Sequence, residues 1–84
     1  MNTVKISKKA FKQLAKIPLK DRERIFAESK KLSQMPDCKN VKALDNHKYD
    51  YRLRVGNYRI FFDFDGPVKI VSVEEVRKRD ESTY

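Results

Sequence analysis

The sequence has very little of several residue types on which common functions depend. It contains one cysteine, Cys38, one histidine, His47, only two glycines and no tryptophan. A single cysteine excludes an internal disulfide framework and a cysteine-rich zinc site. A single histidine excludes a nuclease mechanism that uses two histidines. We therefore expect no metal or other cofactor.

Long apolar segments are missing as well. No run of about 18 apolar residues is present, so no transmembrane helix is expected, and residues 1–9 lack the apolar core of a secretory signal. We expect a cytoplasmic protein that does not bind a membrane. With 84 residues, the chain forms one small domain with no room for a second core. Its nine aromatic residues argue against disorder.

Positive charge, in contrast, is abundant and unevenly distributed. The chain has 20 Lys and Arg against 12 Asp and Glu, which gives a net charge of +8. Residues 1–36 carry ten basic and three acidic residues, so most of the excess lies there. A basic surface of this size is typical of polyanion binding, with nucleic acid as the first candidate. The simpler interpretation is that the charge only keeps the protein soluble.

Hydrophobic periodicity predicts an α+β domain in which a helical hairpin packs on one face of a sheet. The predicted elements are a strand at 3–6, helices at 8–16 and 19–34, and a three-stranded antiparallel meander at 49–55, 58–64 and 68–76. Ser7 is a plausible cap for the first helix, and residues 37–47 are expected to connect the helices to the meander. The buried positions expected on the two helices are Ala10, Phe11, Leu14, Ala15, Ile25, Phe26, Ser29 and Leu32.

The two-residue loop Gly56-Asn57 fixes the register of the central hairpin. Alternation then places six side chains on the core face: Tyr51, Leu53, Val55, Tyr58, Ile60 and Phe62. On the other face, Arg54 lies directly opposite Arg59, and like charges in that position are destabilising. A bound phosphate would relieve the repulsion, and Phe61 on the same face could stack a base. Alternatively, this face is only solvated, with Arg52 paired to a neighbouring aspartate.

The segment Tyr51–Ile60, with the sequence YRLRVGNYRI, resembles the RelE/ParE toxin superfamily. The ending Arg79–Tyr84 looks like the C-terminal arginine–tyrosine motif of that family, and the order of elements matches over the whole chain. The resemblance implies a twisted antiparallel sheet and a type II toxin that is neutralised by a cognate antitoxin. The toxin alone is expected to be a monomer.

The superfamily holds two activities, and the resemblance favours the RelE type, a metal-independent endoribonuclease that cuts mRNA in the ribosomal A site. The catalytic residues implied by position are Arg52, Arg54, Arg59, Arg79 and Tyr84, with Arg77 as the competing register for the late arginine. The alternatives are a ParE-like toxin that inhibits gyrase and an RNA-binding module without catalysis.

Each residue then has an expected role in attack of the RNA 2′-hydroxyl on the adjacent phosphate. Arg54 and Arg59 clamp the phosphate, Arg79 assists the leaving 5′-oxygen, and Tyr84 stacks a base. The proton acceptor stays open between Asp50, Arg52 and the ribosome, and Asp50 is expected to serve mainly as an ion-pair partner of Arg52. Further contacts to RNA are expected from Lys8, Lys9, Lys12, Lys16, Phe61 and Arg77.

Overall fold

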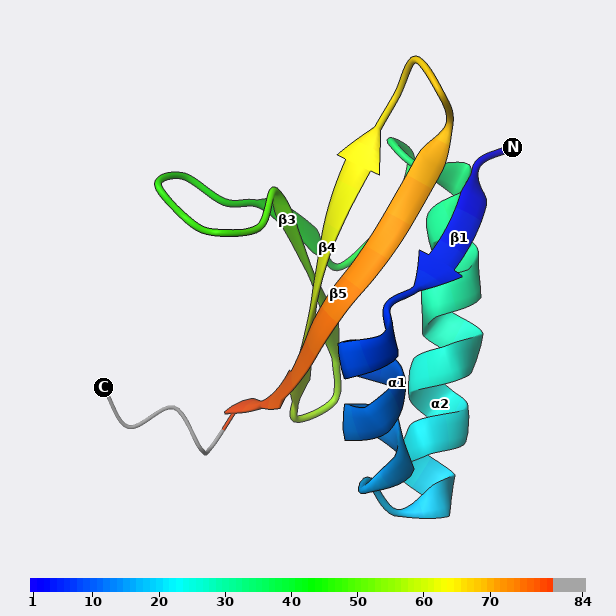
Figure 1. The fold of residues 1–84 in the computed structure, drawn as a ribbon, viewed down its shortest axis with the longest axis vertical. Helices are drawn as coiled ribbons and strands as arrows, with labels where there is room; N and C mark the ends of the chain where they lie inside the picture. Colours follow the sequence, from blue (N-terminus) through cyan, green and yellow to red (C-terminus); the bar gives the residue numbers. More distant parts are fainter. Residues whose placement is uncertain (80–84) are drawn as a thin grey trace.

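The computed structural model describes residues 1–79 and has the α+β architecture expected from the sequence. The elements in chain order are β1 (Thr3–Ile6), α1 (Lys8–Ala15), α2 (Leu19–Lys30), η1 (Lys31–Gln34), β2 (Val41–Ala43), β3 (Tyr51–Val55), β4 (Tyr58–Asp65) and β5 (Ile70–Lys78). The sheet order is β1-β5-β4-β3-β2, with β1 parallel to β5 and the other neighbours antiparallel. Both long helices lie on the same side of this sheet (Figure 1).

The residue that precedes each long helix favours the start of that helix. Ser7 accepts a hydrogen bond from the Ala10 backbone N–H at 3.0 Å, which satisfies one free donor of the first turn of α1. Pro18 stands directly before α2, where its fixed φ suits helix entry. The second helix was predicted to continue to residue 34. The α-helix ends at Lys30, and the next four residues form the 3₁₀ helix η1.

The core lies between the helices and the inner face of the sheet. The fully buried side chains there are Leu14, Ile25, Leu32, Ile60, Phe62, Val71 and Val73. Two positions expected in the stripe of α1 are instead exposed: Phe11, with 60% of its surface accessible, and Ala15. Phe11 lies at the rim of the helical layer, where its ring contacts Phe26 edge-on at a centroid distance of 6.4 Å.

The central hairpin has the predicted register. Val55 pairs with Tyr58, Leu53 with Ile60, and Arg54 with Arg59. Gly56 has a φ of +55°, a value that a residue with a Cβ rarely adopts, which is why glycine fits this turn. The hairpin therefore presents its apolar side chains to the helices and its arginines to the outer face.

Two features of the sheet were not predicted. The segment 37–47 contains β2, which adds a fifth strand by pairing Val41 with Leu53. β5 also begins later than residue 68 and carries a bulge, since Phe61 pairs with Glu75 while Phe62 pairs with Val73. The extra residue, Glu74, shifts the alternation, so that Val76 still points inward and Glu75 points to the outer face.

Candidate nucleic-acid interface

Three arginines form a row across the outer face of the sheet. Arg54 on β3 lies opposite Arg59 on β4, which in turn lies opposite Arg77 on β5. Paired residues of neighbouring strands project to the same face, so the three side chains share one side of a rigid platform. Each like-charged pair disfavours the unliganded sheet by an amount on the order of 0.2–1 kcal/mol.

Arg52 extends this arginine row into a cluster. Its Nε is buried and has no hydrogen-bond partner among the described residues. Burial is the main cause that lowers the pKa of its guanidinium, and the charges of Arg59, Arg54 and Arg79 lower it further. Arg79 reaches the cluster because its backbone N–H donates to the Asn57 carbonyl at the tip of the hairpin. The cluster thus concentrates positive charge at a point where a polar donor still needs an acceptor.

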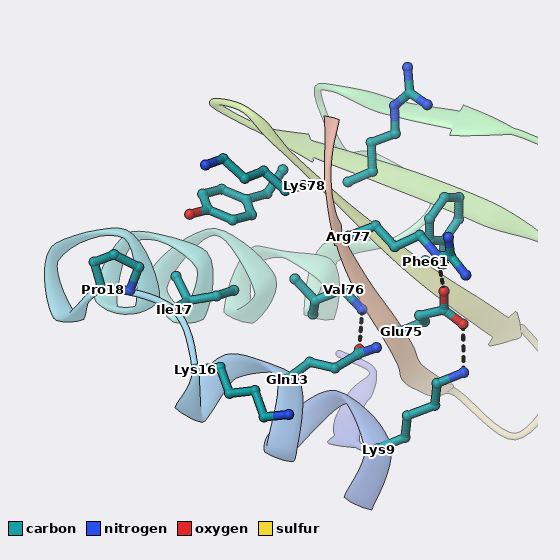
Figure 2. Close-up of a pocket in the computed structure, with 12 residues that line it drawn as sticks. Lys9, Gln13, Lys16, Ile17, Pro18, Phe61, Glu75, Val76, Arg77 and Lys78 are labelled. Atoms are coloured by element: carbon teal, nitrogen blue, oxygen red, sulfur yellow. Dashed lines mark hydrogen bonds and ion pairs between the residues drawn. The ribbon is translucent and has the colours of Figure 1, made fainter. Parts of the chain in front are cut away.

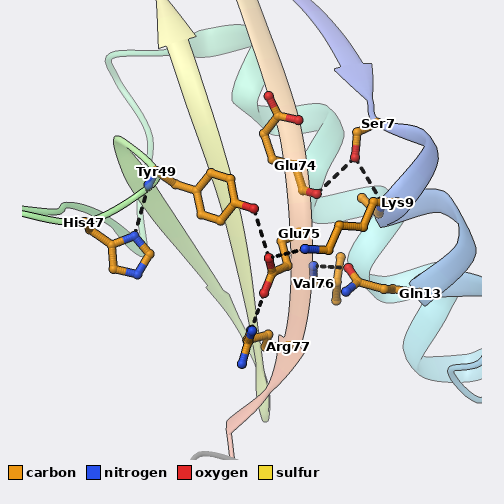
Figure 3. Close-up of polar contacts among 10 residues, drawn as sticks. Ser7, Lys9, Gln13, His47, Tyr49, Glu74, Glu75, Val76 and Arg77 are labelled. Atoms are coloured by element: carbon orange, nitrogen blue, oxygen red, sulfur yellow. Dashed lines mark hydrogen bonds and ion pairs between the residues drawn. The ribbon is translucent and has the colours of Figure 1, made fainter.

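Glu75 is the one buried acid among residues 1–79, with 4% of its surface exposed. Its carboxylate accepts hydrogen bonds from Lys9 Nζ at 2.8 Å, from the Tyr49 hydroxyl at 2.9 Å and from Arg77 Nε (Figure 3). Burial alone would raise the pKa of Glu75, but these hydrogen bonds and the charge of Arg77 outweigh it and lower the pKa to about 2. Burial and the bond to Glu75 raise the pKa of Tyr49 to about 12. Glu75 is therefore an ionised anchor that ties α1 and the loop before β3 to β5.

A pocket of about 470 Å³ opens between α1 and the edge of β5 (Figure 2). Its wall is formed by basic side chains together with Ile17 and Pro18; the basic residues are Lys9, Lys16, Arg59, Arg77 and Lys78. Gln13 closes one side by accepting the Val76 backbone N–H at 2.7 Å. Lys9 and Lys16, two of the lysines predicted to bind RNA, therefore line the same pocket as two members of the arginine row. A separate hollow on α1 is lined by Lys8, Lys12 and other residues of that helix.

Aromatic rings cover the outer face next to the arginine row. Phe61 is only 8% exposed because His47 and Tyr49, both from the loop before β3, lie against its ring. The exposed ring is that of His47, which was not among the predicted site residues. The base contact expected for Phe61 stays a prediction.

The other predicted site residues lie in different places. Asp50 is exposed, and its backbone N–H donates to Asp63 Oδ1 at 2.9 Å. Within residues 1–79, Asp50, which directly precedes β3, forms no ion pair with Arg52. Arg77 and Arg79, the two candidates for the late catalytic arginine, both lie in the same basic region. Tyr84 lies outside the described residues.

The sequence also missed Glu75 and Tyr49, although one signal for Glu75 was present. Alternation along β5 runs through Val71 and Val73 and would place residue 75 in the core, yet the next apolar residue is Val76. A bulge is the simplest way to keep Val76 inside, and it turns the acidic side chain toward the arginines.

Comparison with known proteins identifies the family of the chain. Residues 4–83 match the model of a family described as the ParE toxin of the type II toxin–antitoxin system, parDE. This match places the chain in the RelE/ParE toxin superfamily. The chain belongs to the matched family, type II toxin–antitoxin toxins of the ParE type. Comparison with curated proteins by sequence gives no match.

Solved structures of RelE proteins share the fold. A chain of the archaeal RelE–RelB complex from Pyrococcus horikoshii OT3 is 24% identical with a TM-score of 0.81, covering 96% of this chain and 98% of that one. A chain of the RelBE2 complex from Mycobacterium tuberculosis is 23% identical, with a TM-score of 0.80 and coverage of 93% and 98%. The isolated E. coli RelE toxin is 18% identical, with a TM-score of 0.79 and coverage of 99% and 89%.

No helix within residues 1–79 has the length and apolar character needed to cross a membrane. The same part of the chain contains no group of three His, Cys, Asp or Glu side chains arranged to hold a metal ion.

Proposed function

We propose that this protein is a RelE-like toxin that cuts mRNA in the A site of the translating ribosome. The observation that carries the proposal is the arginine cluster, in which the buried Nε of Arg52 has no hydrogen-bond partner in the described part of the chain. Guanidinium forks match phosphate oxygens in a bidentate way, so an RNA phosphate is a suitable ligand for this cluster. Cleavage follows when the 2′-hydroxyl next to that phosphate attacks it.

The arginines of the cluster have different roles in this reaction. Arg54 and Arg59 hold the phosphate, whose negative charge increases in the transition state, and Arg79 meets the leaving 5′-oxygen. Donors fixed on strands are already oriented when the charge develops, which is the condition for strong electrostatic stabilisation. Removing one such donor typically lowers a rate by about 10²–10³-fold.

Within residues 1–79, the carboxylates of this face are poorly suited to accept the 2′-proton. Glu75 is ionised, but its oxygens are occupied by three donors. Asp50 lies next to Asp63, away from the arginine row. We assign the proton acceptor to the ribosome–mRNA complex, which agrees with a toxin whose substrate is positioned for it by the ribosome.

Lysines of α1 extend the basic face and supply binding without chemistry. Lys8, Lys12 and Lys16 lie along the exposed surface of this helix, and we propose that they contact ribosomal RNA phosphates. Contacts of this kind release counterions, so their contribution to binding falls as salt is added.

A cognate antitoxin is the proposed protein partner. The proteins from P. horikoshii and M. tuberculosis described above were solved as RelE–RelB and RelBE2 complexes. With a net charge of +8, this chain suits an acidic, amphipathic antitoxin segment. Exposed apolar side chains on the helical layer, Phe11 and Leu19, offer anchors for its apolar face.

The second candidate function is gyrase inhibition, which the ParE type of the matched family favours. The two functions differ in a direct assay. Purified toxin is incubated with mRNA on programmed ribosomes, with the same mRNA free in solution, and with gyrase and supercoiled DNA, and new 5′ ends on the mRNA are mapped. We expect cuts only on the ribosome.

Two variants connect the assay to the arginine row. Arg59→Ala should cut about 10²–10³-fold more slowly at saturating toxin. Lys30→Ala, which removes one positive charge on α2, should cut at the wild-type rate. Intact mRNA together with inhibited gyrase would favour the ParE-like function, and ribosome or RNA binding without cleavage would favour a non-catalytic binding module.

A further inference from the structure

The loop between β2 and β3 folds three aromatic rings into one cluster on the outer face. His47 is nearly parallel to Phe61, with a centroid distance of 5.1 Å and an interplanar angle of 14°. Tyr49 stacks on Phe61 at 5.8 Å, and the His47 and Tyr49 centroids are 5.9 Å apart. The three distances are similar, so His47 and Tyr49 lie side by side over the same ring. Phe61 and Tyr49 are buried, whereas His47 is exposed.

Hydrogen bonds hold the histidine ring in this orientation. The Tyr49 backbone N–H donates to His47 Nδ1 at 3.1 Å, so this nitrogen is the acceptor of a bond that fixes the plane of the ring. The Tyr49 hydroxyl is fixed in turn by Glu75 at 2.9 Å. Figure 3 shows this chain from His47 through Tyr49 to Glu75 and Arg77. The same carboxylate therefore positions both the aromatic cluster and one arginine of the row.

The aromatic cluster lies directly beside the arginine row. Phe61 follows Arg59 by two residues on β4 and pairs with Arg52 on β3. Two residues along a strand span about 6–7 Å. A nucleotide whose phosphate is held by Arg54 and Arg59 thus has an exposed, flat ring next to it on the same face.

We propose that His47 is a base-stacking residue, and that its exposed face receives a nucleobase of the RNA whose phosphate the arginine row binds. This inference rests on the proposed function and adds the residue that contacts the base. An isolated loop histidine gains little by being held flat, whereas a stacking partner must be pre-oriented. Base stacking on aromatic rings is tolerant of sequence, because every base has a π-face.

The test uses a short single-stranded RNA that carries 2-aminopurine and 2′-O-methyl groups, which prevent cleavage. Stacking quenches the fluorescence of 2-aminopurine, so one titration gives both the affinity and the stacking. Wild-type toxin should bind and quench. His47→Ala should bind about 5- to 150-fold more weakly, which corresponds to the loss of one stacked base, and should lose the quenching at saturation.

Two further variants separate stacking from other effects. His47→Phe keeps a ring but loses the Nδ1 acceptor, and it should retain most of the affinity and the quenching. Arg54→Gln should weaken binding while leaving the quenching at saturation intact, because it removes a phosphate contact only. Thermal melts of each variant establish that the fold is retained.

The outcomes distinguish this inference from the proposed function. If His47→Ala quenches as wild type does, the stacking role is refuted, while ribosome-dependent cleavage by the wild type stands. If His47→Ala loses quenching and His47→Phe does not restore it, a flat ring is not what the RNA needs, and the inference is again wrong. If wild-type toxin neither binds this RNA nor cuts mRNA on ribosomes, the proposed function fails and the inference fails with it.

Discussion

Replacing Glu75 with glutamine should lower the unfolding free energy of the toxin and make it less dependent on pH. Glu75 is 4% exposed and accepts hydrogen bonds from Lys9, Tyr49 and Arg77. Glu75→Gln keeps the size of the side chain but removes the charge and one acceptor oxygen. The variant leaves two cationic donors without their anion next to three other arginines, so both the folded state and the orientation of Arg77 should suffer.

The lowered pKa of Glu75 gives the size and the sign of its contribution to the unfolding free energy. Folding lowers the pKa of Glu75 from 4.5 to about 2, and a shift of that size corresponds to about 3 kcal/mol in favour of the ionised folded state. The Lys9 and Arg77 side chains are 55% and 62% exposed, so solvent screening reduces this figure, and we expect a loss of about 1–3 kcal/mol. Because the folded pKa is the lower one, this contribution is complete above pH 4.5 and disappears as the pH falls through 2.

Urea unfolding at several pH values between 7 and 2 measures this contribution. Glu74→Gln is the matched control, since it removes the same charge from the neighbouring residue, whose side chain is only half-buried. The difference in unfolding free energy between wild type and Glu75→Gln should be largest at pH 7 and should shrink below about pH 4.5. An equal loss in Glu74→Gln, or a difference that does not change with pH, would refute the assignment of Glu75 as an ionised anchor.

Three other variants test the arginine row, the lysine helix and the hairpin turn. Arg54→Gln should leave the unfolding free energy unchanged or raise it by a few tenths of a kcal/mol, because it removes like-charge repulsion with Arg59, and it should still lower the single-turnover cleavage rate. Lys12→Ala should weaken ribosome binding, most strongly at low salt, and leave cleavage by saturating toxin nearly unchanged. Gly56→Ala should lose about 1–2 kcal/mol in chemical denaturation, because φ is +55° there and the added Cβ would lie 3.2 Å from Arg24 Nη1.

The parts of the fold that the sequence predicted correctly are those set by local rules. A two-residue loop determines the pairing of both flanking strands, so Gly56 and Asn57 were enough to place Arg54 opposite Arg59. Alternation then assigned every hairpin side chain to a face, since a slip of one residue would expose the whole apolar set. Ser7 similarly marked where the first helix begins.

The parts that were missed depend on contacts between distant segments. β2 is three residues long and exists because Val41 can pair with Leu53 at the free edge of the hairpin. The side chain of Glu75 is buried only because Lys9 and Tyr49, 66 and 26 residues away in the sequence, meet it from opposite sides. Because these partners are distant in the sequence, the residues around Glu75 do not indicate that its side chain is buried, and an acidic residue in a strand is normally expected to be solvated.

The distribution of exposed groups separates two kinds of binding surface on this small domain. The outer face of the sheet presents guanidinium groups, and its large rings Phe61 and Tyr49 are buried, with His47 stacked on Phe61. Protein interfaces are usually anchored by exposed aromatic and aliphatic side chains, and here such groups, Phe11 and Leu19, lie on the helices. The sheet face is therefore better suited to a phosphate chain than to a protein surface, which is why we favour the nuclease over the gyrase inhibitor. The exposed apolar side chains of the helical layer, Phe11 and Leu19, are better suited to a protein partner.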